Sequence, residues 1–249
     1  MNLSVVIITY NEQNNIAHCL ASVQNVADEI LVIDSYSTDH TQEICQQFNV
    51  RFLQHEFKGY GEQKQYAVGM ASFDYILSLD ADEELSPELQ RAIGQEKQSW
   101  SADCYTFNRK TFYCLKPILH CGWYPDKQMR LFNRNSARWN DRKVHEKILI
   151  RHNAKPMHLS GDLNHYTCTS IAEHQEKERK YARMNAEMLI GKKKKILFWT
   201  PYIKGAFRFF KIYVLKLGLL DGYYGFVISK TLATSSFWKY KWAQQRNAQ

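Results

Sequence analysis

Two acidic residues separated by one position end a short apolar segment of the chain. Asp80 closes the run Tyr75–Asp80, whose composition is typical of a buried strand, and Asp82 follows two residues later. Alternate side chains of an extended chain point the same way, so both carboxylates can face one cation. Oxygen ligands of this kind suit Mg²⁺ or Mn²⁺, which usually bridge to the phosphates of a substrate. The spacing therefore predicts a divalent-cation site at this strand end.

Polar side chains also follow two earlier apolar segments, Leu3–Thr9 and Glu29–Asp34. Open parallel sheets bind ligands beyond the carboxyl ends of their strands. A single carboxylate at a strand end can instead cap the next helix, but three polar ends around one crevice favour a ligand site. The side chains that we expect at this site are those of Tyr10, Asn11, Glu12, Asp34, Ser35, Asp80 and Asp82.

A loop with two glycines, Lys58–Gly61, precedes Lys64. Backbone amides and a lysine at the start of a helix favour a phosphate group. The loop lacks the Walker pattern, so it is not a P-loop. An exposed helical lysine without a ligand is the alternative for Lys64.

The elements that must position these residues alternate over the first hundred positions. The order βαβαβαβ predicts an α/β fold with a parallel sheet and right-handed crossovers. The expected strands are Leu3–Thr9, Glu29–Asp34, Val50–His55 and Tyr75–Asp80. The expected helices are Asn15–Val26, Thr41–Phe48, Gly61–Ala71 and one that Ser86 opens.

The pattern changes from about Asp103 onward. Short alternating segments, Cys104–Arg109, Gln128–Asn133 and Lys147–Arg151, indicate antiparallel strands and loops. From Ser170 the chain reads as helical and basic. We therefore expect one domain in residues 1–168 and a helical region in residues 169–249.

Composition excludes several classes of protein. The 249 residues include 33 Lys and Arg against 25 Asp and Glu, which gives a net charge of +8 and a pI of about 9.1. The hydrophobic content of 45% and the aromatic content of 14% exclude a disordered chain. We expect neither a signal peptide nor a membrane span, because no basic segment precedes the first apolar run and no run of about 18 apolar residues occurs. The six cysteines show no zinc spacing, so we expect reduced thiols in the cytoplasm.

The excess positive charge lies in the C-terminal third. Lys192–Lys195 precede the apolar run Ile196–Trp199, and apolar residues at helical spacing then alternate with lysine and arginine. A basic amphipathic helix of this type can lie in a membrane interface; the alternative is that its apolar face packs on the core. We expect peripheral binding to the inner face of the cytoplasmic membrane, and a homodimer is left open.

Four blocks of the sequence resemble the nucleotide-sugar domain of family 2 glycosyltransferases with the GT-A fold. They are VVIITYNE, LVIDSYSTDHT, KGYGEQKQYA and LSLDADEEL. Three later blocks, GWYPDKQMRLFNR, KVHEK and NHY, resemble bacterial lipopolysaccharide core β-1,4-glucosyltransferases. The resemblance implies a Rossmann-like, mostly parallel sheet flanked by helices, with a helical, basic C-terminal region. It also implies a UDP-sugar donor and a lipopolysaccharide core acceptor.

The resemblance assigns roles to individual residues. Asp82 and His165 would hold a divalent cation, Mg²⁺ or Mn²⁺, and Glu146 occupies the place of the catalytic carboxylate, with Asp126 as the alternative base. Nucleotide-sugar binding falls to Thr9, Tyr10, Asn11, Glu12, Asp34, Ser35, Lys64, Asp80 and Ala81, and acceptor binding to Trp123, Arg130 and His145. The sequence departs from many relatives, because Tyr36 and His40 replace glycines and the base motif reads His-Glu instead of Glu-Asp.

These residue types fit the implied reaction. The departing diphosphate must be neutralised, which a divalent cation does, and a carboxylate must take the proton of the acceptor hydroxyl. One base without an enzyme nucleophile predicts an inverting displacement, so UDP-glucose and a heptose of the inner core would give a β-glucoside. The alternatives are a polyprenyl-phosphate glycosyltransferase and a basic polyanion-binding protein without activity. We expect no nucleic-acid partner, because acids at the strand ends repel phosphate.

Overall fold

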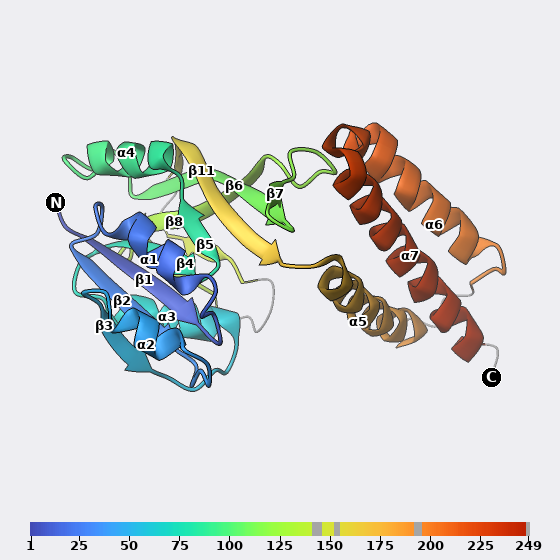
Figure 1. Ribbon diagram of the computed structural model, residues 1–249, viewed down its shortest axis with the longest axis horizontal. Helices are drawn as coiled ribbons and strands as arrows, with labels where there is room; N and C mark the ends of the chain where they lie inside the picture. Colours follow the sequence, from blue (N-terminus) through green and yellow to red (C-terminus); the bar gives the residue numbers. More distant parts are fainter. Residues whose placement is uncertain (141–145, 152–154, 192–195, 248–249) are drawn as a thin grey trace. The chain divides into compact units, whose positions relative to one another are not determined.

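The chain, seen in a computed structural model, forms two compact units (Figure 1). Residues 1–140, 146–151, 155–191 and 196–247 are described; the predicted acceptor residue His145 and the run Lys192–Lys195 lie outside them. The first unit comprises residues 1–109 and 126–165, and the second comprises residues 110–125 and 166–249. Residues 110–125, which belong to the predicted domain 1–168, thus group with the C-terminal helices. The predicted division into a catalytic domain of residues 1–168 and a C-terminal region of residues 169–249 stays a prediction.

The predicted parallel strands form one half of the main sheet. They are β1 (Leu3–Thr9), β2 (Glu29–Asp34), β3 (Arg51–Gln54) and β4 (Tyr75–Asp80), in the order β3-β2-β1-β4 with every pair parallel. All seven residues of β1 are buried, as expected for an apolar strand covered on both faces. Between these strands lie α1 (Ile16–Val23), α2 (Thr41–Cys45) and α3 (Tyr60–Met70). The predicted βαβαβαβ order is therefore confirmed.

The other half of the sheet continues beyond β4 in the order β8-β6-β11-β5. The strands are β5 (Glu83–Leu85), β6 (Cys104–Tyr113), β8 (Asp126–Asn133) and β11 (Met157–Cys168), and β7 (Lys116–Pro117) pairs with β6. The pairs β4–β8, β6–β8 and β5–β11 are antiparallel. The sheet is therefore mixed, because the expected antiparallel segments join the parallel strands. A separate antiparallel pair is formed by β9 (Ala137–Trp139) and β10 (Ile148–Ile150).

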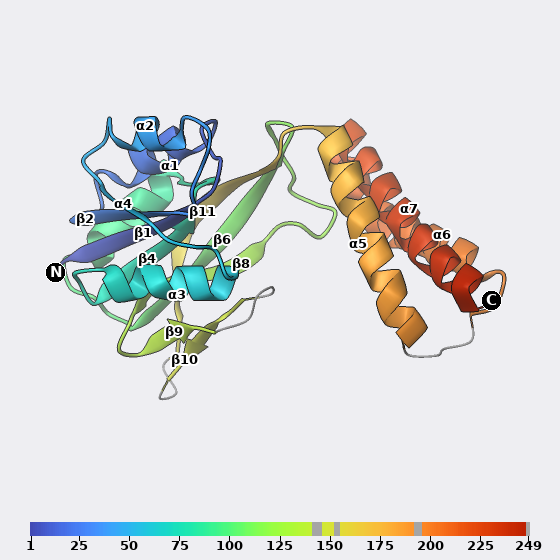
Figure 2. The same ribbon diagram turned by 90° about the horizontal axis from the view of Figure 1, so that it is seen from below.

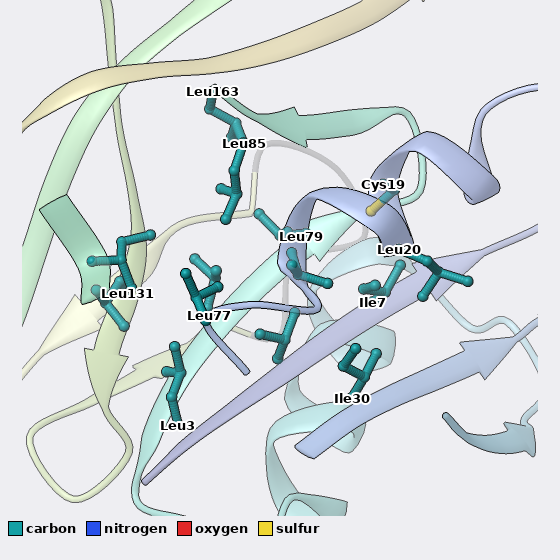
Figure 3. Close-up of a cluster of buried hydrophobic side chains, with 14 of the residues drawn as sticks. Leu3, Ile7, Cys19, Leu20, Ile30, Leu77, Leu79, Leu85, Leu131 and Leu163 are labelled. Atoms are coloured by element: carbon teal, nitrogen blue, oxygen red, sulfur yellow. The ribbon is translucent and has the colours of Figure 1, made fainter. Parts of the chain in front are cut away.

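Helices and the small hairpin cover the two faces of the parallel half. Figure 2 shows α1, α2 and α4 (Pro87–Glu96) on one face and α3 with β9 and β10 on the other. Ser86 caps α4 by accepting a hydrogen bond from the Leu89 amide, as its sequence position predicted. Alternate residues of β1 enter separate cores: Leu3 and Ile7 pack with Leu20 and Leu79 in the cluster of Figure 3, whereas Val6 and Ile8 face α3 and the hairpin. Packing on both faces fixes the strand ends that carry the site.

The second unit consists mainly of helices, as the sequence predicted. Its long helix α7 (Gly222–Asn247) packs against α5 (Ile171–Gly191) and α6 (Thr200–Phe210). Two short helical turns, η1 (Lys211–Leu215) and η2 (Gly218–Asp221), join α6 to α7. Among the described residues, no single helix has both the length and the apolar character needed to cross a membrane. The segments Thr200–Leu215 and Gly218–Arg246 meet the length and apolar criteria only when taken together, and the chain bends by 73° between them.

Candidate active site

The three polar strand ends predicted from the sequence lie side by side. In the sheet register, Thr9 of β1 is opposite Asp34 of β2, and Ile8 of β1 is opposite Asp80 of β4. Thr9 is buried, and its hydroxyl oxygen has no hydrogen-bond partner within the described part of the chain. A buried hydroxyl without a partner is costly unless a ligand completes it. The edge of the sheet formed by the carboxyl ends of β1, β2 and β4 is therefore a candidate ligand-binding site.

The carboxylate of Asp34 organises the loop that follows β2. It is fully buried and accepts hydrogen bonds from the backbone amide and the hydroxyl of Ser37. Ser35 accepts a bond from the Gln63 side chain at 3.1 Å, which ties the same loop to α3. Tyr36 between them has φ of +61°, a conformation that glycine adopts without strain. A tyrosine therefore occupies a left-handed position of this loop that would suit glycine.

The loop after β1 is joined to the loop after β2. The Asn11 side chain accepts a hydrogen bond from the Thr38 amide at 2.8 Å, and Tyr10 is exposed beside it. Burial raises the pKa of Glu12, and the charges of Asp82 and Asp80 add to this effect, while a hydrogen bond from Asn15 opposes it. Acidic groups thus converge at the strand ends from β1 and β4.

Lys64 joins two of the predicted site carboxylates. Its Nζ lies 2.9 Å from Asp80 Oδ1 and 3.0 Å from Glu146 Oε1, and the lysine is only 1% exposed. The alternative of an exposed helical lysine is therefore wrong. Glu146, the predicted base, is thereby held beside the end of β4 although it lies 82 positions further along the chain than Lys64.

Ion pairs continue from Asp80 in the other direction. The Arg130 guanidinium lies 3.0 Å from Asp80 Oδ2 and 2.7 Å from the fully buried Glu83, and Arg109 lies 3.8 Å from Glu83 and 2.7 Å from Asp126. Four carboxylates thus alternate with three cations along the chain of contacts. In order, these residues are Asp126, Arg109, Glu83, Arg130, Asp80, Lys64 and Glu146.

The charges along this chain of contacts keep Asp80 and Arg130 ionised. Burial alone raises the pKa of Asp80, but the charges of Lys64 and Arg130 outweigh burial and hold that pKa well below its ordinary value. Burial lowers the pKa of Arg130, and the carboxylates of Glu83 and Asp80 raise it above its ordinary value. Asp80 is therefore a fixed negative charge at the strand end.

Asp82 and His165 form the pair predicted to hold a cation. His165 Nε2 lies 3.2 Å from Asp82 Oδ2, and Ala81 beside Asp82 is buried. Within the part of the chain that the structure describes, no three Asp, Glu, His or Cys side chains converge as a complete metal site. A two-donor set still fits Mg²⁺ or Mn²⁺, which commonly bind one or two protein groups and take their other ligands from substrate phosphates and water.

Two predicted acceptor residues have other contacts in the structure. Arg130 is buried, and its guanidinium contacts Asp80 and Glu83. Trp123 belongs to the second unit, where its ring lies at the edge of Tyr113 and His174.

The alternative base Asp126 is engaged by Arg109 and by the side-chain amide of Gln128, which donates at 2.8 Å. Of the two carboxylates considered as base, only Glu146 shares an ion-pair partner, Lys64, with Asp80 at the end of β4 among the described residues.

Three residues outside the predicted site complete the chain of contacts. Glu83 and Arg109 are members of it, and Trp139 lies under both Lys64 and Arg130, whose charged groups are 4.8 and 5.6 Å from its ring. The Trp139 indole also donates to Ser78 of β4 at 3.2 Å. The run of acids at positions 82–84 was the available signal for Glu83; Trp139 had none, because its position depends on the hairpin β9–β10.

Comparisons with known proteins agree with this architecture. The model of glycosyl transferase family 2 matches residues 4–154. A glycosyltransferase of Rickettsia felis, described as uncharacterized, is 30% identical over 94% of this chain and 87% of its own. LpsC of Rhizobium meliloti, a lipopolysaccharide core biosynthesis glycosyltransferase, is 28% identical over 99% of this chain and 93% of its own.

A solved structure shares the fold. Residues 1–349 of TarS from S. aureus, in complex with UDP-GlcNAc, superpose with a TM-score of 0.50 at 17% identity, over 95% of this chain and 91% of that one. The mixed sheet with its flanking helices is the GT-A fold, as the sequence predicted. The match of the family model over more than half of the chain shows that this protein is a glycosyltransferase of family 2.

Proposed function

We propose that the protein transfers glucose from UDP-glucose to a heptose of the lipopolysaccharide inner core and inverts the anomeric centre. The observation that carries the proposal is the position of Glu146, which Lys64 holds beside Asp80 at the carboxyl ends of the strands. Ligands of open α/β sheets bind at this edge. The similarity to LpsC over 99% of the chain supports a lipopolysaccharide core saccharide as the acceptor.

In the proposed reaction Glu146 is the general base. Its carboxylate takes the proton of the acceptor hydroxyl as that oxygen attacks the anomeric carbon and the bond from that carbon to the diphosphate oxygen breaks. A single displacement from the side opposite the leaving group converts an α-linked donor into a β-glucoside. Thr9 offers the nucleotide its buried hydroxyl, which has no hydrogen-bond partner among the described residues.

The charges at the strand ends require a counter-ion for the donor. Glu12, Asp80 and Asp82 would repel a diphosphate, and Lys64 already contacts two carboxylates. Asp82 and His165 are the residues that would hold a divalent cation there. Such a cation neutralises the charge that develops on the leaving diphosphate.

The donor and acceptor are tested by direct assay. Purified protein is incubated with Mn²⁺ and lipopolysaccharide truncated after the heptose region, together with UDP-glucose, UDP-galactose or UDP-N-acetylglucosamine. We expect transfer from UDP-glucose and a β-configured product by NMR. An α-configured product would contradict inversion. Transfer from UDP-galactose or UDP-N-acetylglucosamine instead would show that glucose is not the sugar transferred. Transfer to polyprenyl phosphate alone would show that the acceptor is not lipopolysaccharide.

Binding measurements separate the enzyme from a basic protein that binds any polyanion. We expect UDP to raise the melting temperature only when Mn²⁺ is present. A polyanion-binding protein would be stabilised without Mn²⁺, and equally by nucleic acid and heparin.

A further inference from the structure

Exposed apolar side chains line one face of α6 and η1 in the second unit. Trp199, Ile203, Phe207, Phe210 and Val214 recur at intervals of three or four residues, and each exposes between 40 and 58% of its surface. This spacing places them on one face of a helix. Pro201, Gly205 and Ile212 on the opposite face are buried instead; Gly205 lies against Phe237 of α7, and Ile212 clusters with Val227 and Ile228 of α7. The apolar stripe therefore does not serve the contact between α6 and α7.

The stripe continues over the turn that leads into α7. Leu215, Leu217, Leu219, Leu220 and Tyr223 are exposed by 44 to 67%. We call these five side chains and the five named above, from Trp199 to Val214, the apolar belt. Soluble proteins rarely expose a continuous apolar surface of this kind unless it binds a partner or a membrane.

Exposed positive charges accompany the belt. Lys204, Arg208 and Lys211 are exposed, and each directly follows a belt residue in the sequence. No described acidic side chain forms an ion pair with any of these three cations. Residues 196–247 contain eight lysines and arginines and one acid, Asp221, whose carboxylate is buried against His120 at 3.0 Å.

We propose that the apolar belt lies in the interface of a lipid bilayer with anionic headgroups. An apolar helix face bordered by cations buries its side chains at the boundary between headgroups and acyl chains, while the cations attract anionic lipid. Trp199 and Tyr223 have the amphipathic rings that favour this depth. A second copy of the chain fits less well, because a symmetric interface would bring the same cations together. The inference does not depend on the proposed reaction.

Flotation of the full chain with vesicles tests the proposal without any sugar substrate. The vesicles contain either phosphatidylglycerol with phosphatidylcholine or phosphatidylcholine alone. We expect the protein to float with the anionic vesicles at low salt, to detach as salt rises, and to bind the neutral vesicles much more weakly.

Two sets of substitutions separate the charged and the apolar contributions. Replacing Lys204, Arg208 and Lys211 by glutamine should weaken binding on the order of a hundredfold, because each cation near an anionic surface contributes roughly fivefold. Phe207→Ser combined with Leu220→Ser should weaken binding by at least about tenfold through lost apolar burial. Met184→Ser with Met188→Ser is the matched control, since both methionines are exposed on α5, and it should bind as the wild type does.

Three results would overturn the proposal. The first is a wild-type protein that stays unbound at low salt, and the second is a belt variant that binds as tightly as the wild type. The third is a belt variant that dissociates a dimer of the lipid-free protein, because the belt is then covered by a second copy of the chain. Circular dichroism of each variant confirms that it is folded before flotation. Loss of glycosyl transfer leaves these outcomes unaffected.

Discussion

Lys64 and Glu146 form an ion pair of 3.0 Å that joins helix α3 to the segment after β9. The same Nζ lies 2.9 Å from Asp80 and 4.8 Å from the Trp139 ring. One buried ammonium group therefore holds the proposed base, the end of β4 and the hairpin in a fixed relation. A group that neutralises two carboxylates at once has consequences for stability as well as for catalysis.

Removing the positive charge of Lys64 should destabilise the fold. We expect Lys64→Met to lower the free energy of unfolding by about 3 kcal/mol, because it leaves two half-buried carboxylates without their shared partner. Urea denaturation measures the change. The double variant Lys64→Met/Glu146→Gln should recover part of the loss, since one of the uncompensated charges is then removed.

Lys58→Met is the matched control for that experiment. Lys58 is exposed, and among the described residues its ion pair is with the exposed Glu56 at 4.0 Å, so the substitution should leave stability unchanged within error. Equal stability of Lys64→Met and the wild type would mean that the buried ion pair does not form in solution.

The general base is tested by isosteric substitution. Glu146→Gln keeps the size and polarity of the side chain but cannot accept a proton, so kcat should fall by roughly 10²–10⁴ while the affinity for UDP stays similar. Asp126→Asn is the comparison, because Arg109 and Gln128 already engage that carboxylate. If Asp126→Asn alone produces the loss of kcat, Asp126 is the base and Glu146 is not.

The cation ligands are tested by binding as well as by turnover. Asp82→Ala removes one of the two donors of the pair with His165, so UDP binding should no longer respond to Mn²⁺ and transfer should be abolished. Calorimetric titration of UDP with and without Mn²⁺ measures the effect. Glu43→Ala removes an exposed carboxylate of α2 whose ion pair, in the part of the chain that the structure describes, is with His40, and it should keep the Mn²⁺ response. Near-normal turnover of Asp82→Ala would contradict the assignment.

The parallel half of the fold could be predicted because its signals are local. Leu3–Thr9, Glu29–Asp34 and Tyr75–Asp80 are continuous apolar runs that end in polar residues, and their observed bounds coincide with the predicted ones. Once these strands are parallel neighbours, the convergence of their polar ends follows from topology.

The charge network could not be predicted because it depends on register between distant strands. Glu83 meets Arg130, 47 positions later, only because β8 pairs with β4 and β11 pairs with β5. The strand β11 itself has mixed polarity, with His158, Asp162 and His165 among apolar residues, so its periodicity gives little signal. The grouping of residues 110–125 with the helices likewise rests on long-range contacts, such as Asp221 with His120.

The second unit contains a buried histidine that should make its stability depend on pH. His174 is 5% exposed, and its Nδ1 lies 3.0 Å from the Tyr113 hydroxyl. Burial lowers the pKa of His174 below its ordinary value of 6.5, the charge of Lys177 lowers it further, and Glu173 opposes both. The unfolded chain therefore binds a proton at this residue more readily than the folded chain does. The stability that neutral His174 contributes is present above about pH 6.5 and is lost as pH falls below it.

Substitution of His174 isolates this contribution from the other eight histidines. We expect the melting temperature of the wild type to fall more steeply between pH 7 and pH 5 than that of His174→Gln, because glutamine can keep a hydrogen bond to Tyr113 and does not titrate in this range. Scanning calorimetry at matched ionic strength measures both profiles. His158→Gln is the control, since the His158 ring is exposed, lies 3.3 Å from Thr106 and takes no part in the buried contact between His174 and Tyr113. Parallel profiles for the wild type and His174→Gln would show that His174 is not the group whose protonation opposes folding.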